Sequence, residues 1–199
     1  MAVDAFLQFK TTGKNAVVLK GETKDKFMKA PPAGPPAFEI KSWQFGASNP
    51  VNLSSQSGGG GSGKVQFDSF TITKNVDASS TKLFHTACTG GHYDECVLWL
   101  RKAGGSNTQQ SGQVYLKFNF KLVMIENIEW SQSGDDPPGE TVKFQYGALS
   151  IVYYPQNQDG SIARGKKKNA TWDRVTNAQV FDAGFGNSTP ETEPNPGDN

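Results

Sequence analysis

Residues 112–130 read GQVYLKFNFKLVMIENIEW, and this stretch decides the fold. Every second position is apolar without a break, at Val114, Leu116, Phe118, Phe120, Leu122 and Met124. A period of two predicts a β-strand with one face on a core, whereas a helix would scatter these residues around its circumference. At about 3.3 Å per residue the strand spans roughly 36 Å, about twice the ordinary length. So long a strand suits the wall of a barrel or a large sandwich.

Several other predicted strands lose their alternation partway along. The apolar positions change parity between Ile40 and Trp43, near Ser69, and across Gly147 within 141–154. A slip of one residue is typical of a β-bulge, and bulged strands indicate a curved sheet that closes on itself. One helix is expected over 79–89, with Asp77, Ser79 or Ser80 as its cap and the Gly90-Gly91 pair at its end. Apolar runs at 5–9 and 16–19 predict an N-terminal hairpin.

The composition limits the classes of partner. The 199 residues carry a net charge of +1, which argues against nucleic acid or an anionic membrane as the main partner. There is no run of 18 apolar residues, and two cysteines do not make a disulfide scaffold. The start MAVDAFLQFK does not read as a signal peptide. We therefore expect synthesis in the cytoplasm, with any export by a route that reads no N-terminal signal.

Two motifs imitate binding sites without meeting the chemical requirements. GGGGSGK at 58–64 has the spacing of a phosphate-binding loop, but Val65 follows the lysine and opens a strand instead of a helix. His85, Cys88, His92 and Cys96 have metal-like spacing, yet ligands on one helix cannot surround a tetrahedral ion. We predict no catalytic residues, no cofactor and no metal, and no nucleotide site.

Seven short stretches occur in the order seen in one known family. They are MAVDAF at 1–6, KGETKDK at 20–26, IKSWQFG at 40–46, GGGGSGKV at 58–65, FTITK at 70–74, ACTGGHY at 87–93 and LRKAGG at 100–105. In this order they resemble the Hcp family, the haemolysin-coregulated proteins of type VI secretion systems. The resemblance covers about residues 1–175. The proline-rich APPAGPPA at 30–37 and the tail beyond Val180 depart from the family pattern.

The resemblance implies a closed β-barrel of two packed antiparallel sheets over 1–180, with one short flanking helix. The polar, proline-containing composition of 181–199 predicts a disordered tail. It implies hexameric rings that stack into the inner tube of a contractile injection machine and are exported with it. A VgrG-like spike protein, a contractile sheath and small effector proteins in the ring lumen would be the partners.

Two positional hypotheses follow from residues considered within that architecture. Gln44 alternates with Trp43 and Phe45, whose side chains need the core, so Gln44 is expected to face the lumen. The glycine-rich loop has no side chains able to form a core, and we expect it to govern ring stacking. Its residues are Ser57, Gly58, Gly59, Gly60, Gly61, Ser62 and Gly63.

Three alternatives stay open at this point. The chain could be the tail-tube protein of a related contractile phage-like particle. It could be a monomeric β-sandwich binding module with exposed aromatics grouped at one end, or an enzyme exported by the same machinery. An exported enzyme would need a polar pocket, for which the sequence offers no pair of matched groups.

Overall fold

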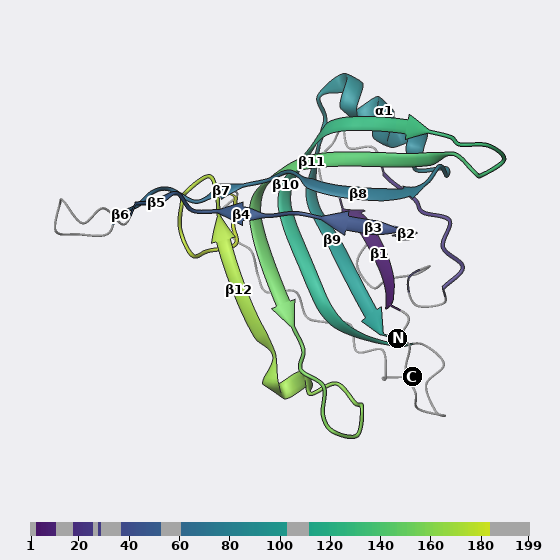
Figure 1. Cartoon of the computed structure of the whole chain (residues 1–199). Helices are drawn as coiled ribbons and strands as arrows, with labels where there is room; N and C mark the ends of the chain where they lie inside the picture. Colours follow the sequence, from purple (N-terminus) through teal and green to yellow (C-terminus); the bar gives the residue numbers. More distant parts are fainter. Residues whose placement is uncertain are drawn as a thin grey trace.

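The computed structural model describes residues 3–10, 18–25, 28, 37–52, 61–102 and 112–183. These residues form a mainly β structure with one α-helix and one 3-10 turn, shown in Figure 1. The elements in chain order are β1 (Val3–Lys10), β2 (Phe38–Glu39), β3 (Ser42–Gln44), β4 (Ala47–Ser48), β5 (Val51–Asn52), β6 (Gly61–Ser62), β7 (Gln66–Phe67), β8 (Phe70–Asn75), α1 (Ser80–Thr89), β9 (His92–Lys102), β10 (Gln113–Ser131), β11 (Gly139–Tyr153), η1 (Arg164–Lys166) and β12 (Lys168–Asp173).

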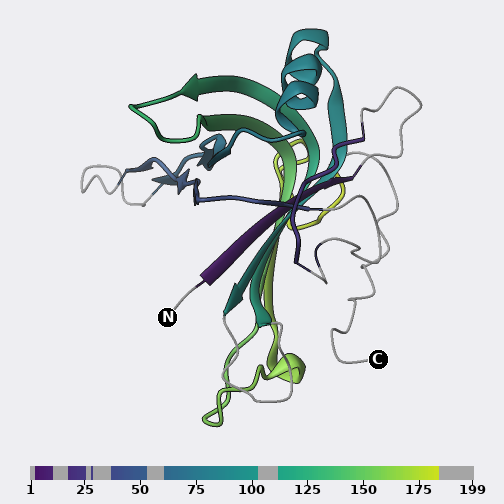
Figure 2. The same cartoon turned by 90° about the vertical axis from the view of Figure 1, so that its right-hand side faces the viewer.

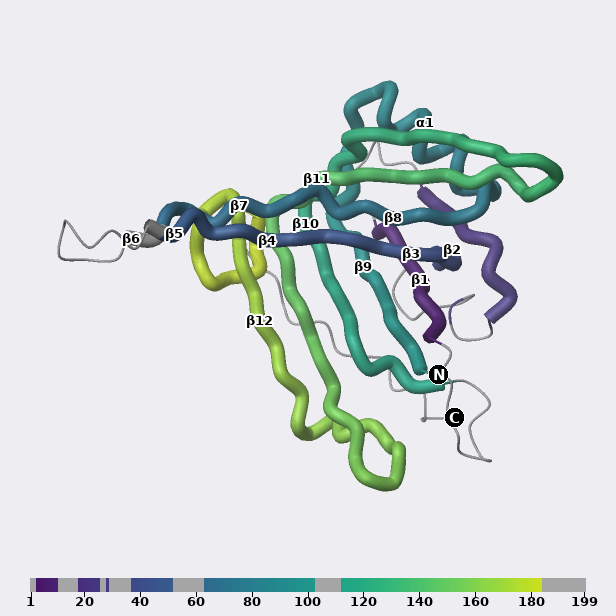
Figure 3. The backbone as a smooth tube through the Cα atoms, viewed as in Figure 1, coloured from purple at the N-terminus to yellow at the C-terminus, as the bar shows by residue number. Residues whose placement is uncertain are grey.

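One eight-stranded antiparallel sheet dominates the molecule. Its order is β2-β1-β9-β10-β11-β8-β3, and β12 pairs with β11 beside β8. Strand β11 pairs with β8 along its first half and with β12 along its second half. Strands β10 and β11 are long enough to belong both to the part of the sheet that contains β8 and to the part that contains β12. The sheet curls where it passes from one part to the other, as the backbone in Figure 3 shows. Figure 2 shows the curl from the side.

The bend lies where the sequence predicted a loss of phase. Pairing of β10 with β11 passes from Lys121 opposite Ala148 to Val123 opposite Tyr146, and between them Leu122 has φ 50°. A β-carbon on Gly147 would lie 3.1 Å from that of Leu122. Glycine at 147 therefore leaves room for the unusual backbone of Leu122, and the two long strands bend together.

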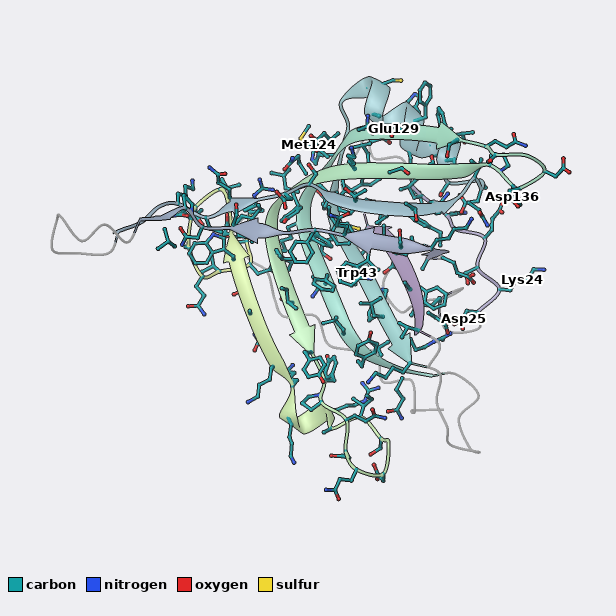
Figure 4. The ribbon with its side chains drawn as sticks, viewed as in Figure 1. Lys24, Asp25, Trp43, Met124, Glu129 and Asp136 are labelled. Carbon is teal, nitrogen blue, oxygen red and sulfur yellow. The ribbon has the colours of Figure 1, made fainter. Side chains whose placement is uncertain are left out.

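The core fills the inside of the curl and is rich in phenylalanine. Phe70, Phe120 and Phe144 are each fully buried, and the rings of Phe70 and Phe120 lie 4.6 Å apart, edge to face. Trp43 stacks on Phe70 at 6.2 Å from strand β3, in the position labelled in Figure 4. Of the alternating residues of 114–124, Phe118 and Phe120 reach this core as predicted. Beyond them the prediction is wrong, because the bend at Leu122 changes the parity, so that Val123 is buried and Met124 is exposed.

The phase slip at 40–43 is a change of neighbours. Strand β2 pairs with β1, whereas β3 pairs with β8 at the other end of the sheet. The two residues between β2 and β3 each donate one backbone hydrogen bond to a different strand, from Ile40 N to Ala5 O of β1 (3.0 Å) and from Lys41 N to Thr73 O of β8 (2.7 Å). This segment bridges the two edges of a half-barrel. The mainly β fold is confirmed, but in the part of the chain described here the sheet is a half-barrel and not the closed barrel of the prediction.

The predicted helix is confirmed. It begins after Ser79 and ends at Gly90, whose φ of 64° suits a residue without a β-carbon. Leu83 is buried against the sheet, and the hydroxyls of Thr86 and Tyr93 lie 2.8 Å apart. The proposed boundary at 180 stays a prediction, since residues 184–199 lie outside the described structure.

Candidate functional site

A narrow arm continues strands β3 and β8 beyond the end of the sheet. We call residues 46–52 and 61–68 the arm; it carries the ladders β4–β7 and β5–β6 and projects to the left in Figure 1. Backbone bonds from Asp68 N to Gly46 O and from Gly63 N to Pro50 O, both 2.9 Å, continue these ladders. The arm is a two-stranded ribbon that pairs with itself.

The predicted stacking loop belongs to the far end of this ribbon. Gly61 and Ser62 form β6, and Gly63 donates to Pro50. Ser57, Gly58, Gly59 and Gly60 lie outside the described residues. Strand β7 follows Lys64 within two residues, so the glycine motif does not lead into the helix that a phosphate-binding loop requires. No observation here tests whether the loop stacks rings.

Gln44 lies on the face of its strand opposite to Trp43 and Phe45, as their alternation predicted. Its backbone pairs with Thr71 at the edge strand β3, and its side chain is exposed. Trp43 and Phe45 pack against the core on the opposite face, with their rings 6.5 Å apart. The exposure of Gln44 leaves it available to a lumen, but whether it faces one stays a prediction.

The four metal-like residues separate in the fold. His85 and Cys88 lie on exposed positions of α1, and His92 is exposed at the start of β9. Cys96 is fully buried in the core, and this burial raises the pKa of its thiol well above the ordinary value. Within the described ranges no group of three or more His, Cys, Asp or Glu side chains could hold a metal ion.

Two strands form open edges at opposite sides of one layer of the sheet. The layer runs β1-β9-β10-β11-β12. Strand β2 pairs with β1 only at Phe6 and Leu7, and Ile40 N adds one backbone bond to Ala5 O. On the outer side of β12 the bridge to Ala178 involves Asp173, and no described strand pairs with residues 168–172. A strand that ends a sheet in this way can pair with another chain.

No helix in the described part of the chain is both long enough and apolar enough to cross a membrane.

The curled sheet, the helix and the arm together form a fold that is found in solved type VI secretion proteins. A structure described as a type six secretion system protein matches 89% of this chain and 99% of its own length, with a TM-score of 0.73 and 24% identity. Hcp1 from Salmonella typhimurium matches 90% of this chain and all of its own, with a TM-score of 0.64 and 22% identity. At these identities the likeness concerns the fold alone.

The sequence itself identifies the family. Residues 6–153 match the family described as type VI secretion system effector, Hcp. Protein hcp1 of Pseudomonas aeruginosa is 31% identical over 118 residues, which are 59% of this chain and 70% of that protein. The chain belongs to the Hcp family, and it is a tube and effector protein of the type VI secretion system.

The sequence analysis did not find two groups of side chains that join distant strands, one at the base of the arm and one beneath α1. Arg174, just after β12, contacts the base of the arm. Lys74 and Glu140 form an ion pair with no exposed area beneath α1. Neither had a signal in the sequence, because each group draws its members from strands far apart in the chain.

Proposed function

We propose that this protein forms hexameric rings that stack into the inner tube of a type VI secretion machine. In this proposal sheath contraction propels the tube, the rings leave the cell with it, and small effector proteins travel in the lumen. The observation that carries the proposal is the pair of unlike outer strands, β1 and β12, that end one layer of the curled sheet in an Hcp-family chain.

Ring closure gives these edges a partner. Pairing β12 of one copy with β1 of the next is a heterologous contact, because the two surfaces differ. Such contacts repeat around an axis and close into a ring when the rotation per subunit divides a full turn. A standard interface buries about 800 Å² on each partner, so two lateral contacts take roughly 1,600 Å². The chain exposes 11995 Å², which leaves ample area for stacking and for the lumen.

The partners and the route follow from the same proposal. The spike protein, the sheath and the effectors would meet the tube at its end, its outside and its lumen. The chain would be made in the cytoplasm, leave through the machine itself and do no catalytic work. The two rival assignments predict different particles: a phage-like tail tube also stacks, whereas a binding module stays monomeric.

Gln44 supplies a test of where the lumen lies. In a background with Cys88 changed to serine, Gln44→Cys provides one exposed thiol, because Cys96 is buried. We expect a small maleimide to label it in stacked tubes and a bulky one to be excluded. Equal labelling by both reagents would place Gln44 outside the lumen, but it would not contradict the proposed ring.

Negative-stain images of the purified protein test the proposed function as a whole. Rings with a central hole, and rods built from them at high concentration, are the expected particles. Featureless particles the size of one chain would reject the tube in favour of the monomeric binding module.

A further inference from the structure

The arm leaves the sheet at a place where ordinary packing does not fix its direction. Two hollows of about 530 and 550 Å³ border the stretch 64–67 at its base. Both are lined by Lys64, Val65 and Phe67 from the arm and by Trp172 from β12. Both hollows open to the surface, so no side chains fill the space beside the base of the arm. A ribbon bordered by hollows has room to swing unless a specific contact holds it.

One arginine provides that contact. The guanidinium of Arg174 lies 5.5 Å from the centre of the Phe67 ring and 4.8 Å from that of Tyr146. The two rings also meet edge to face at 6.4 Å. Arg174 thus links an arm residue to a sheet residue, and cation–π contacts of this kind are attractive within about 6 Å of the ring centroid.

Arg174 is itself fixed to the sheet by hydrogen bonds. Its Nη1 donates to Gln145 Oε1 (3.0 Å) and to Tyr146 O (2.9 Å), and its backbone N donates to Gly147 O (2.8 Å). A planar guanidinium can donate in its plane while its face meets an aromatic ring, which an ammonium cannot do. Arg174 therefore binds the sheet through its hydrogen bonds and contacts the ring of Phe67 in the arm with the face of its guanidinium.

A short polar chain extends the anchor to the other end of the arm base. Gln145 Nε2 donates to Ser69 Oγ (2.9 Å) and to Glu126 Oε2 (3.1 Å), and Ser69 Oγ donates to Glu126 as well. The hydroxyl of Tyr146 donates to Asp68 O at 3.4 Å. Burial raises the pKa of Tyr146 to about 12, so its proton stays in place at neutral pH.

We propose that Arg174 is the positioning residue that sets the direction of the arm and so presents it to the next ring. The inference rests on the proposed stacking function, but the clamp itself can be measured without tubes. Loss of the arginine should release the arm at its base while the half-barrel keeps its fold.

Trypsin offers a direct measurement, because the exposed Lys64 lies in the arm and Lys166 and Lys167 lie on a separate exposed loop. For Arg174→Ala we expect cleavage after Lys64 to become about three- to tenfold faster, because the arm loses the cation–π contact between Phe67 and Arg174. Cleavage at the 166–167 loop should stay unchanged and serves as the internal reference. Arg164→Ala, which removes a half-exposed arginine on that loop, is the matched control and should leave Lys64 cleavage unchanged.

The outcomes separate the clamp from the stacking function. Unchanged cleavage at Lys64 in Arg174→Ala overturns the proposal. Faster cleavage at Lys64 with rings that no longer stack supports both the clamp and the function of the arm. Faster cleavage with normal tubes supports the clamp and contradicts stacking by the arm.

Phe67→Leu keeps the proposal testable if Arg174→Ala unfolds the whole chain and speeds cleavage at every site. This variant removes the ring from the arm and leaves the hydrogen bonds of Arg174 intact. It should reproduce the selective cleavage after Lys64. Cleavage at the wild-type rate in Phe67→Leu rejects the clamp. Arg174→Lys should behave like Arg174→Ala, because it restores the charge but not the planar face.

Discussion

Replacing Lys74 with methionine is expected to lower the free energy of unfolding by about 3–5 kcal/mol. The ammonium is fully buried and lies 2.9 Å from Glu140 Oε2, whose side chain is also fully buried. It also lies within hydrogen-bond distance of Asn75 O (2.8 Å), Asp77 Oδ1 (2.8 Å) and Ser80 Oγ (3.1 Å). Methionine would leave Glu140 as a buried charge without its cation, and α1 would lose the bond between Lys74 and Ser80, while Ser80 Oγ would still donate to Glu140 Oε2 (2.7 Å).

Urea unfolding at one fixed protein concentration measures this loss, because ring formation would otherwise add to the apparent stability. Lys166→Met, at an exposed lysine, is the control and should stay within about 0.5 kcal/mol of the wild type. Adding Glu140→Gln to Lys74→Met should recover part of the loss, since the uncompensated charge is then gone. A loss below about 1 kcal/mol for Lys74→Met would show that water or a rearranged side chain neutralises Glu140.

Removing six residues from the glycine-rich loop is expected to abolish tubes and secretion while rings persist. Deletion of 55–60 leaves two residues between the paired strands β5 and β6, a length that a β-hairpin accepts. The half-barrel and its open edges are untouched, so lateral contacts should survive. The loop's glycines permit a close backbone approach, and the ordering cost of about 1 kcal/mol or more per residue would be offset only by a neighbouring ring.

Sedimentation, electron microscopy and a secretion assay together read out this deletion. Deletion of 104–109, in the Gly- and Asn-containing connection between β9 and β10, is the matched control and should still give tubes. If tubes and secretion also survive deletion of 55–60, the loop is a passive linker. Stacking would then have to be sought at 20–26 or near the N-terminus.

The local periodicity of the sequence was enough to predict the elements of the fold. Alternation predicted β10, the slip at Gly147 located the bend of the half-barrel, and Ser79 and Gly90 bounded α1. These features depend on neighbours in the chain, and single-sequence reasoning has access to them. The family resemblance, built on the order of short stretches, is confirmed by the match over residues 6–153.

Features that depend on distant partners were predicted less well. The predicted N-terminal hairpin of 5–9 with 16–19 lies partly outside the described structure, which omits 11–17. Within it, β1 pairs with β2 and β9, and 18–20 form no strand. The slip at 40–43 predicted a bulge, whereas the chain changes partner there, and a loss of phase cannot tell the two apart. The contacts of Arg174 with Phe67 and of Lys74 with Glu140 join residues more than 60 positions apart, which no local pattern encodes.

The candidate site shows the same division. Exposure of Gln44 followed from its alternation with Trp43, because strand parity is a local property. Within the arm, the sequence predicted the glycine-rich loop and a strand opened by Val65, but not the two ladders, which are too short to give a period. The direction of the arm depends on Arg174 and on the hollows beside it, and both arise from packing between β12 and residues about 100 positions earlier.

The mass of the purified protein in solution tests the central claim most directly. Multi-angle light scattering should give six times 21.5 kDa, about 129 kDa, for a hexameric ring. The measurement belongs at tens of micromolar, where a ring with unlike, strongly paired edges should stay assembled. A single species of 21.5 kDa at that concentration would contradict the ring, and with it the tube.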